Sequence, residues 1–183
     1  MPEETVWATF FDAEVALDRL SIYNGIGNIV EFGCGYGTFT LPAARRSAGI
    51  LHTFDIEPDL VALTSSRARA SGLLNVRASV RDFVAEGTGL ADSSASFAML
   101  FNILHAEKPS ILLAEAWRVL SPGGLVGVMH WNYDPTTPRG PSMDIRPTPE
   151  QCRDWAVAAG FELCRKVVSL PPYHYGIVLQ KNL

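Results

Sequence analysis

The stretch VEFGCGYG at residues 30–37 decides how this chain folds. It continues a short apolar run, Asn28–Phe32, that is typical of a buried parallel strand. Its three glycines let the backbone turn tightly and let a ligand approach without a Cβ in the way. A strand that ends in such a loop and leads into a helix predicts an α/β sheet that binds its ligand at the strand ends.

Helix-like and strand-like segments alternate on both sides of this loop. We expect further strands at residues 50–55, 75–80, 96–102, 125–131, 162–170 and 173–180. We expect helices at residues 5–20, 38–49, 58–72 and around 112–120, and a last one that opens at a capping box, Thr148–Gln151. Five alternations of strand and helix imply parallel strands joined by right-handed crossovers, which make a doubly wound α/β sheet.

Length, composition and charge limit the number of domains and the class of partner. With 183 residues and 48% apolar residues, the chain is expected to form one domain over residues 1–183, with an N-terminal helical part at 1–25. The proline-rich, aperiodic residues 132–149 are expected to form a long loop and a possible lid. The net charge of −4 and the lack of a Lys/Arg run argue against a nucleic-acid partner.

Cysteines and apolar runs indicate the compartment. Three cysteines without CxxC spacing predict neither disulfides nor a metal site. The acidic N-terminus does not resemble a signal peptide. The longest apolar-rich stretch, residues 95–104, is about half the length that crosses a bilayer. We therefore expect a cytoplasmic protein without a membrane partner.

The spacing of the loop glycines argues against a dinucleotide. The fingerprint G-x-G-x-x-G/A requires a small residue at position 38, where this chain has Thr38. Glu31 would face a pyrophosphate, and like charges 4 Å apart repel by about 4 kcal/mol at an effective dielectric near 20. A ligand with an ammonium and a sulfonium reverses that sign, as S-adenosylmethionine does.

Two more acids follow the next two expected strands. Asp55 ends the second strand, 22 residues after Gly33, where a carboxylate can accept both ribose hydroxyls of an adenosine. Asp82 follows the third strand, where it could accept from an adenine amino group while Phe83 packs on the ring. Each acid alone is better explained by a helix cap or a solvated turn, but the three together with the glycine loop favour a ligand site.

These features make the sequence similar to the class I S-adenosylmethionine-dependent methyltransferases. The motifs that carry the resemblance span residues 28–130 in the order of the family: VEFGCGYG at 30–37, FDIE at 54–57, RDF at 81–83, FNILH at 101–105 and RVLSPGG at 118–124. The resemblance implies a Rossmann-like, seven-stranded, mostly parallel sheet with an antiparallel last strand. It also implies S-adenosylmethionine as cofactor, bound by Glu31, Gly33, Cys34, Gly35, Asp55, Ile56, Asp82, Phe83 and Asn102.

Catalytic residues are harder to assign, because the cofactor supplies the activated methyl group. His130, after the fifth strand, is the candidate general base, since imidazole titrates near neutral pH. His105 is a weaker candidate. The chain lacks the Asn-Pro-Pro-Tyr motif after the fourth strand, which argues against DNA amines and glutamine as acceptors. A histidine bonded to a neighbouring loop explains His130 equally well.

The acceptor is expected to lie near Trp131 and Tyr133, and Arg139 or Arg146 could bind its carboxylate or phosphate, although an ordinary solvated loop explains each arginine better. The function predicted from the sequence is methyl transfer to a small molecule by in-line displacement. A non-catalytic module that binds S-adenosylmethionine or S-adenosylhomocysteine is the alternative. A nicotinamide-dependent oxidoreductase fits less well, as does aminopropyl transfer, which needs an acidic diamine site.

Overall fold

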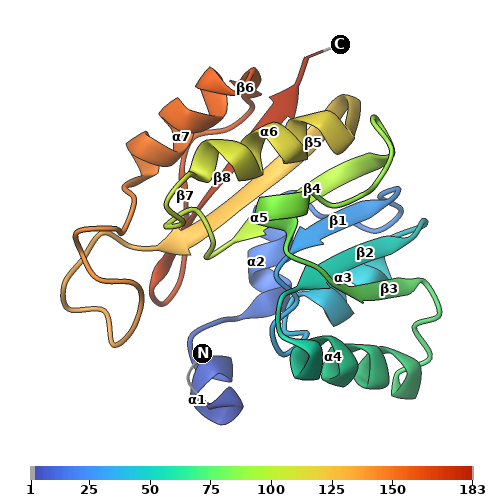
Figure 1. The fold of residues 1–183 in the computed structure, drawn as a ribbon. Coiled ribbons are helices and arrows are strands. Elements are labelled where there is room, and N and C mark those ends of the chain that lie inside the picture. The colour runs from blue at the N-terminus through green and yellow to red at the C-terminus, as the bar shows by residue number, and fades with distance from the viewer. Residues whose placement is uncertain (1–2, 183) are drawn as a thin grey trace.

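The computed structural model describes residues 3–182, and its centre is a single eight-stranded sheet (Figure 1). The strands lie in the order β3-β2-β1-β4-β5-β8-β6, and β7 pairs with β8 beside β6. Their bounds are β1 Ile29–Phe32, β2 Leu51–Asp55, β3 Val76–Val80, β4 Ala95–Phe101, β5 Leu120–Trp131, β6 Phe161–Leu163, β7 Val168–Leu170 and β8 His174–Lys181.

The first five strands pair in parallel, and β8 is antiparallel to β5, β6 and β7. This confirms the mostly parallel, Rossmann-like sheet with an antiparallel last strand. The expected count of seven is wrong, because the segment predicted as one strand at 162–170 is broken at 164–167. Residues 164–166 of this break are exposed at the sheet edge, where a strand needs no continuous partner.

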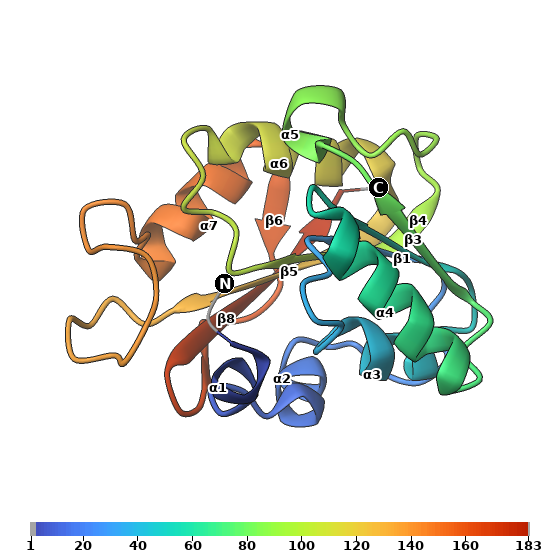
Figure 2. The same ribbon diagram turned by 60° about the horizontal axis from the view of Figure 1, so that its bottom comes forward.

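Helices cover the sheet in two layers (Figure 2). One face carries α2 (Ala13–Arg19), α3 (Thr40–Arg46) and α4 (Pro58–Ala70), and the other carries α5 (Phe83–Glu86), α6 (Pro109–Val119) and α7 (Pro149–Ala158). The predicted capping box opens α7: the Thr148 hydroxyl accepts from the Gln151 N–H, and the Gln151 side chain accepts from the Thr148 N–H. None of the helices in residues 3–182 is long and apolar enough to cross a membrane.

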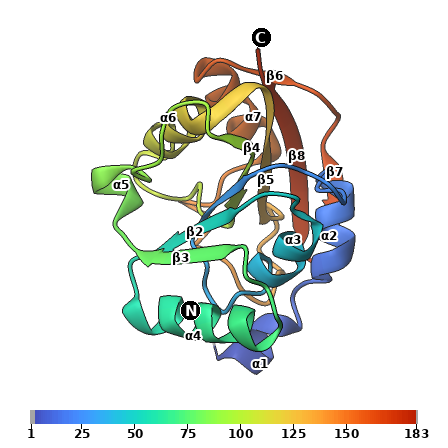
Figure 3. The same cartoon turned by 90° about the vertical axis from the view of Figure 1, so that its right-hand side faces the viewer.

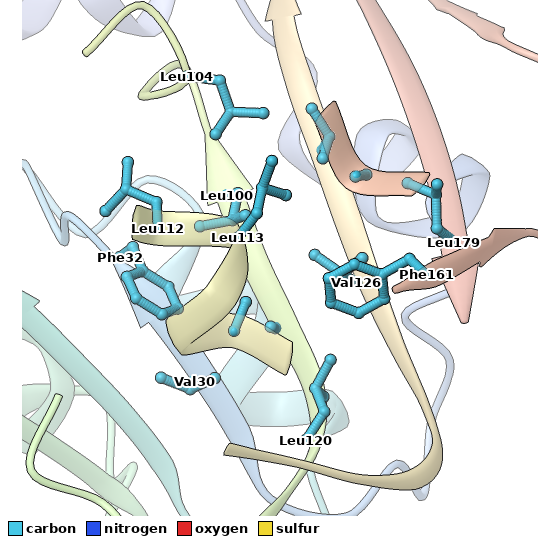
Figure 4. Close-up of a cluster of buried hydrophobic side chains, with 14 of the residues drawn as sticks. Val30, Phe32, Leu100, Leu104, Leu112, Leu113, Leu120, Val126, Phe161 and Leu179 are labelled. Atoms are coloured by element: carbon cyan, nitrogen blue, oxygen red, sulfur yellow. The ribbon is translucent and has the colours of Figure 1, made fainter. Parts of the chain in front are cut away.

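Two apolar clusters fill the space between these layers, and the alternation of side chains along each strand divides the residues between them. On β1, Val30 and Phe32 pack toward α6 (Figure 4), whereas Ile29 packs toward α2 and α3. Glu31 shares the parity of Ile29 and therefore lies on the α3 side. The twist of the sheet is clear in Figure 3, where β3 and β8 run in different directions.

The N-terminal region differs from the single helix expected at residues 5–20. It forms two helices, α1 (Glu4–Ala8) and α2, because Asp12 caps a new start by accepting from the Val15 N–H. Between them, Phe11 forms an isolated bridge with Pro172. Helix α1 has no buried residue and lies outside both layers (Figure 3). The ion pair between Glu4 of α1 and Arg67 of α4 holds it.

Candidate active site

A cavity of about 430 Å³ opens at the carboxyl ends of the central strands. Its volume lies within the usual range of sites for small molecules, and its place is where open α/β sheets bind ligands. The lining residues are Trp7, Glu31, Phe32, Gly33, Cys34, Gly35, Thr38, Phe39, Asp55, Phe101, Asn102, Ile103, His105, Trp131, Arg139, Gly140 and Pro141. The structure thus brings together nine of the residues that the sequence nominated for the site.

The glycine loop forms one wall of the cavity. Gly33, Gly35 and Gly37 all have positive φ, at 93°, 48° and 80°, which only glycine adopts readily. The Gly35 N–H donates to Asp55 Oδ2 at 3.0 Å. The Thr64 hydroxyl of α4 donates to the Gly35 carbonyl at 3.1 Å. Strand β2 and helix α4 therefore fix the loop before any ligand binds.

Glu31 is the most buried acid of the cavity, with 3% of its surface exposed. The hydroxyls of Thr40 and Thr53 donate to its Oε2 at 2.6 and 2.7 Å. Burial raises the pKa of Glu31 to about 7, and the charge of Asp55 adds to the rise, against the lowering effect of the two hydroxyls. No cation among residues 3–182 bonds to this carboxyl group. A cationic ligand group would favour its ionised form.

Asn102 follows β4 in a left-handed conformation, with φ of 54°. Asparagine tolerates this conformation better than most residues. Its Oδ1 and Nδ2 are both buried, and neither has a hydrogen-bond partner within residues 3–182. Such atoms are costly to bury bare, so they mark a place where a ligand or a water supplies the missing bonds.

The residues expected to hold an adenine do not line the cavity. Ile56 is 61% exposed. Asp82 caps α5, where its Oδ1 accepts from the N–H groups of Val84 and Ala85. Phe83 is buried and packs edge-on against Phe32, with 5.5 Å between ring centroids. Their roles toward adenine remain predictions.

Of the two candidate bases, the weaker one, His105, lies at the cavity, and the preferred one, His130, does not. His105 lines the cavity, whereas His130 is fully buried behind it, with 3.3 Å between His105 Nδ1 and His130 Nε2. Burial lowers the pKa of His130 to about 3, and the neighbouring His105 contributes. Burial also lowers the pKa of His105. The preference for His130 is therefore corrected: its side chain lies on the α6 face of β5, because Trp131 takes the opposite face.

Of the four residues expected to bind the substrate, two line the cavity and two do not. Trp131 and Arg139 line the cavity, but Tyr133 is 51% exposed and lies elsewhere. Arg146 is 7% exposed, and its guanidinium donates only to the loop that contains it. The acceptors are the carbonyls of Asn132, Asp134, Arg139 and Pro141 and the hydroxyl of Thr137. Arg146 is thus not placed to bind a substrate anion; it holds residues 132–141 together.

Several lining residues are not among the site residues expected from the sequence, although the aromatic residues of the first helix could cover a cofactor. Trp7 comes from α1, and its ring lies 4.7 Å from that of Phe11. Phe39 and Phe101 contact each other across the cavity floor, with 5.1 Å between centroids. Phe101 could have been found, because it immediately precedes Asn102 at a strand end. Trp7 carried no signal that separates it from an ordinary packed aromatic residue.

A family described as "Methyltransferase domain" matches residues 29–124. The chain belongs to this methyltransferase domain family. The resemblance to class I S-adenosylmethionine-dependent methyltransferases is confirmed, and with it the class of enzyme and the cofactor of the family. The match begins at β1 and ends just before the main part of β5, so it includes the glycine loop and leaves out residues 132–149.

Among curated proteins, the chain resembles the ribosomal protein L11 methyltransferase of Methylococcus capsulatus, at 36% identity over 100 residues. The match covers 54% of this chain, and the chain spans only 31% of that relative's length. The relative's name gives a ribosomal protein as its acceptor. The expectation of a small-molecule acceptor is therefore wrong on this comparison.

Solved structures share the fold. A S-adenosylmethionine-dependent methyltransferase from Aquifex aeolicus has a TM-score of 0.82 and 20% identity, with 93% of this chain and 90% of that one covered. Phosphoethanolamine N-methyltransferase 2 of Haemonchus contortus, solved with S-adenosylmethionine, has a TM-score of 0.77 and 14% identity, with 93% and 52% covered. The same fold accommodates chains of very different sequence.

Proposed function

We propose that this chain transfers the methyl group of S-adenosylmethionine to a nucleophilic side chain of a protein. The observation that carries the proposal is the polarity of one cavity: Glu31 and Asp55 line its glycine-loop side, and His105 lines it beyond β4. Acids at one end suit a cationic cofactor, and an imidazole at the other suits a nucleophile that loses a proton.

The residues present fit this cofactor. The carboxyl group of Glu31 has one oxygen, Oε2, bonded to two hydroxyls, and its other oxygen has no partner among residues 3–182, which leaves it for the ammonium group. Asp55 accepts one backbone N–H on each oxygen and keeps lone pairs for ribose hydroxyls. The buried amide of Asn102 would bond the methionine part. When bound, the cofactor supplies a methyl group on a positively charged sulfur.

The chain's own contribution to the reaction is geometry and a proton acceptor. The protein must hold the nucleophile about 3–3.5 Å from the methyl carbon. His105 is neutral at pH 7, because burial lowers its pKa, so its Nε2 can accept a proton from the acceptor. His130 fixes the ring of His105 through the contact at 3.3 Å, so we assign His130 a positioning role.

A protein acceptor is part of the proposal because of the relative named a ribosomal protein L11 methyltransferase. Helix α1 and the loop at 132–149 both lie at the end of the sheet where β5 stops (Figure 1), so a side chain would enter between them. We include in this proposal that the loop at 132–149 closes over the cavity as a lid. We keep the cytoplasm as the expected location, because Cys34, Cys152 and Cys164 are free thiols.

The experiment has two stages. Isothermal titration calorimetry with S-adenosylmethionine, S-adenosylhomocysteine and NADH should give micromolar binding of the first two and none of NADH. Transfer of tritiated methyl from S-adenosylmethionine to purified ribosomal protein L11 then tests turnover. Binding without transfer to L11 or to any of a broad panel of acceptors would favour the non-catalytic module, and tight binding of NADH would contradict the cofactor assignment.

A further inference from the structure

One basic side chain at the cavity has no partner. Arg139 lines the cavity, and its guanidinium forms no hydrogen bond or ion pair with residues 3–182. Arg46, Arg67 and Arg118 are each paired with acids, and the exposed Arg45 and Arg69, which have no acid partner among residues 3–182, do not line this cavity as the exposed Arg139 does. We propose that Arg139 is the binding residue for a carboxylate group inside this cavity. The proposal deepens the methyltransferase function and rests on it.

The backbone that carries Arg139 is fixed. Arg146 donates through Nε and Nη2 to the Pro141 carbonyl, at 3.0 and 2.7 Å, and through Nη2 to the Arg139 carbonyl at 3.4 Å. Gly140 lies between them with φ of 120°, and a Cβ there would stand 2.7 Å from Arg146 Nη2 and 3.0 Å from Trp131 Cγ. Arg146 therefore holds the loop through its hydrogen bonds, whereas Arg139 lines the cavity.

The place of Arg139 favours a carboxylate of the acceptor over that of the cofactor. Its neighbour Gly140 packs on Trp131 at the end of β5. Strand β5 lies two places from β1 in the sheet, with β4 between them. Two strand spacings are roughly 10 Å, so the Trp131 end of the cavity lies well away from Glu31. Trp7 and Trp131 line the cavity with Arg139 and supply apolar surface for the body of a ligand.

The charge of the cavity favours a carboxylate over a phosphate. Glu31 and Asp55 line the same cavity, and Arg139 is its only lysine or arginine among the described residues. A single guanidinium neutralises a carboxylate in a forked pair. A dianionic phosphate would keep excess negative charge next to two acids.

The first arm of the test locates the carboxylate. Calorimetry compares S-adenosylhomocysteine with 5′-methylthioadenosine, which lacks the amino-acid part, on the wild type and Arg139→Gln. If Arg139 binds the cofactor's carboxylate, the substitution lowers the affinity for S-adenosylhomocysteine by about tenfold or more and leaves the affinity for 5′-methylthioadenosine unchanged. If Arg139 serves the acceptor, as we expect, both affinities stay within about twofold of the wild type.

The second arm uses benzoate and its neutral isostere benzamide, followed by tryptophan fluorescence and indole N–H shifts, with and without saturating S-adenosylhomocysteine. We expect benzoate to bind about tenfold more tightly than benzamide, and Arg139→Gln to remove the difference. Arg69→Gln is the matched control, since it deletes an equal charge from an exposed position on α4.

An effect of Arg139→Gln in either arm supports the proposal and identifies the source of the carboxylate. Wild-type affinities in the first arm together with equal binding of benzoate and benzamide in the second would overturn it. Failure of the cofactor assignment looks different, because the wild type itself would then not bind S-adenosylhomocysteine, and failure of methyl transfer appears only in the turnover assay. The benzoate arm without cofactor still tests Arg139 in that case.

Discussion

The two ends of the cavity differ in how far the chain itself satisfies their polar groups. At β1 and β2, Glu31 accepts from two hydroxyls and Asp55 from two backbone N–H groups. Beyond β5, the guanidinium of Arg139 has no partner among residues 3–182. The first end lies inside the family match at 29–124, whereas Arg139 lies outside it.

We use this difference to distinguish the end of the cavity that binds the cofactor from the end that selects the acceptor. We interpret the end at β1 and β2 as the cofactor end, because it lies inside the family match and the chain already holds its two carboxylates. We interpret the end at Arg139 as the acceptor end, where an unpartnered guanidinium would favour an acceptor that can pair with it. The substitutions below test this division, from the largest expected effect to the smallest.

Arg146→Ala should have the largest effect. It removes the buried guanidinium that holds four carbonyls and the Thr137 hydroxyl, so we expect about 3 kcal/mol or more of lost stability. Urea unfolding followed by circular dichroism measures the loss. The control Arg153→Ala removes an exposed pair with Asp154 and should cost under about 0.5 kcal/mol. Equal midpoints for the two variants would show that Arg146 does not hold the loop.

His105→Gln should lower the methyl-transfer rate by about a hundredfold at pH 7 and leave the affinity for S-adenosylhomocysteine unchanged. The glutamine keeps a polar side chain at the cavity but cannot accept the proton. Single-turnover transfer of tritiated methyl measures the rate, and calorimetry measures the affinity. A variant with the wild-type rate would remove His105 from the role of base.

Asp55→Ala should weaken binding of S-adenosylhomocysteine by about 2 kcal/mol, or roughly thirtyfold. It removes both the expected ribose contact and the hydrogen bond that fixes the Gly35 N–H. Asp82→Ala is the comparison, since Asp82 lies outside the cavity and should matter less. A larger loss for Asp82 than for Asp55 would shift the cofactor toward β3.

Glu31 predicts a pH dependence of cofactor binding. Its pKa near 7 means that much of the free protein carries a protonated Glu31 below that pH, whereas a cationic ligand requires the ionised form. Affinity for S-adenosylmethionine should therefore rise about tenfold from pH 6 to pH 8, with a proton released on binding below pH 7. Calorimetry in buffers of different ionisation enthalpy measures both quantities.

The variant Glu31→Gln should flatten that profile, and a pH-independent wild type would contradict the assignment. Without ligand the sign of the stability effect is opposite. A carboxyl group whose pKa is raised on folding binds more protons in the folded state, so its contribution falls as pH rises from about 4.5 toward 7. Ligand binding and stability therefore respond to pH in opposite directions at Glu31.

The sequence predicted the sheet and the glycine-loop end well, because the signals there are local. Alternating elements, the capping box at Thr148 and the acid at the end of β2 each depend on a few consecutive residues. The sequence could not separate α1 from α2, since the apolar residues Trp7, Phe10 and Phe11 continue a helical pattern across the break. Only the cap at Asp12 and the bridge from Phe11 to Pro172 show that the chain turns there.

The acceptor end was predicted less well, for a physical reason. His130 and Trp131 are adjacent on β5, and one step along a strand reverses the face, so which of them meets the cavity depends on the pairing with β8. Arg139 and Arg146 share one aperiodic loop, and only its three-dimensional path decides which is buried. Tertiary contacts determine which residue faces the cavity and which arginine is buried, and a local sequence pattern does not contain them.

The most direct test is a crystal structure with S-adenosylhomocysteine. We predict that the amino group of the ligand lies within hydrogen-bond distance of Glu31, that the ribose lies on Asp55, and that the sulfur is directed toward Asn102 and His105. A ligand found away from the carboxyl ends of β1 and β2, or touching neither carboxylate, would contradict it.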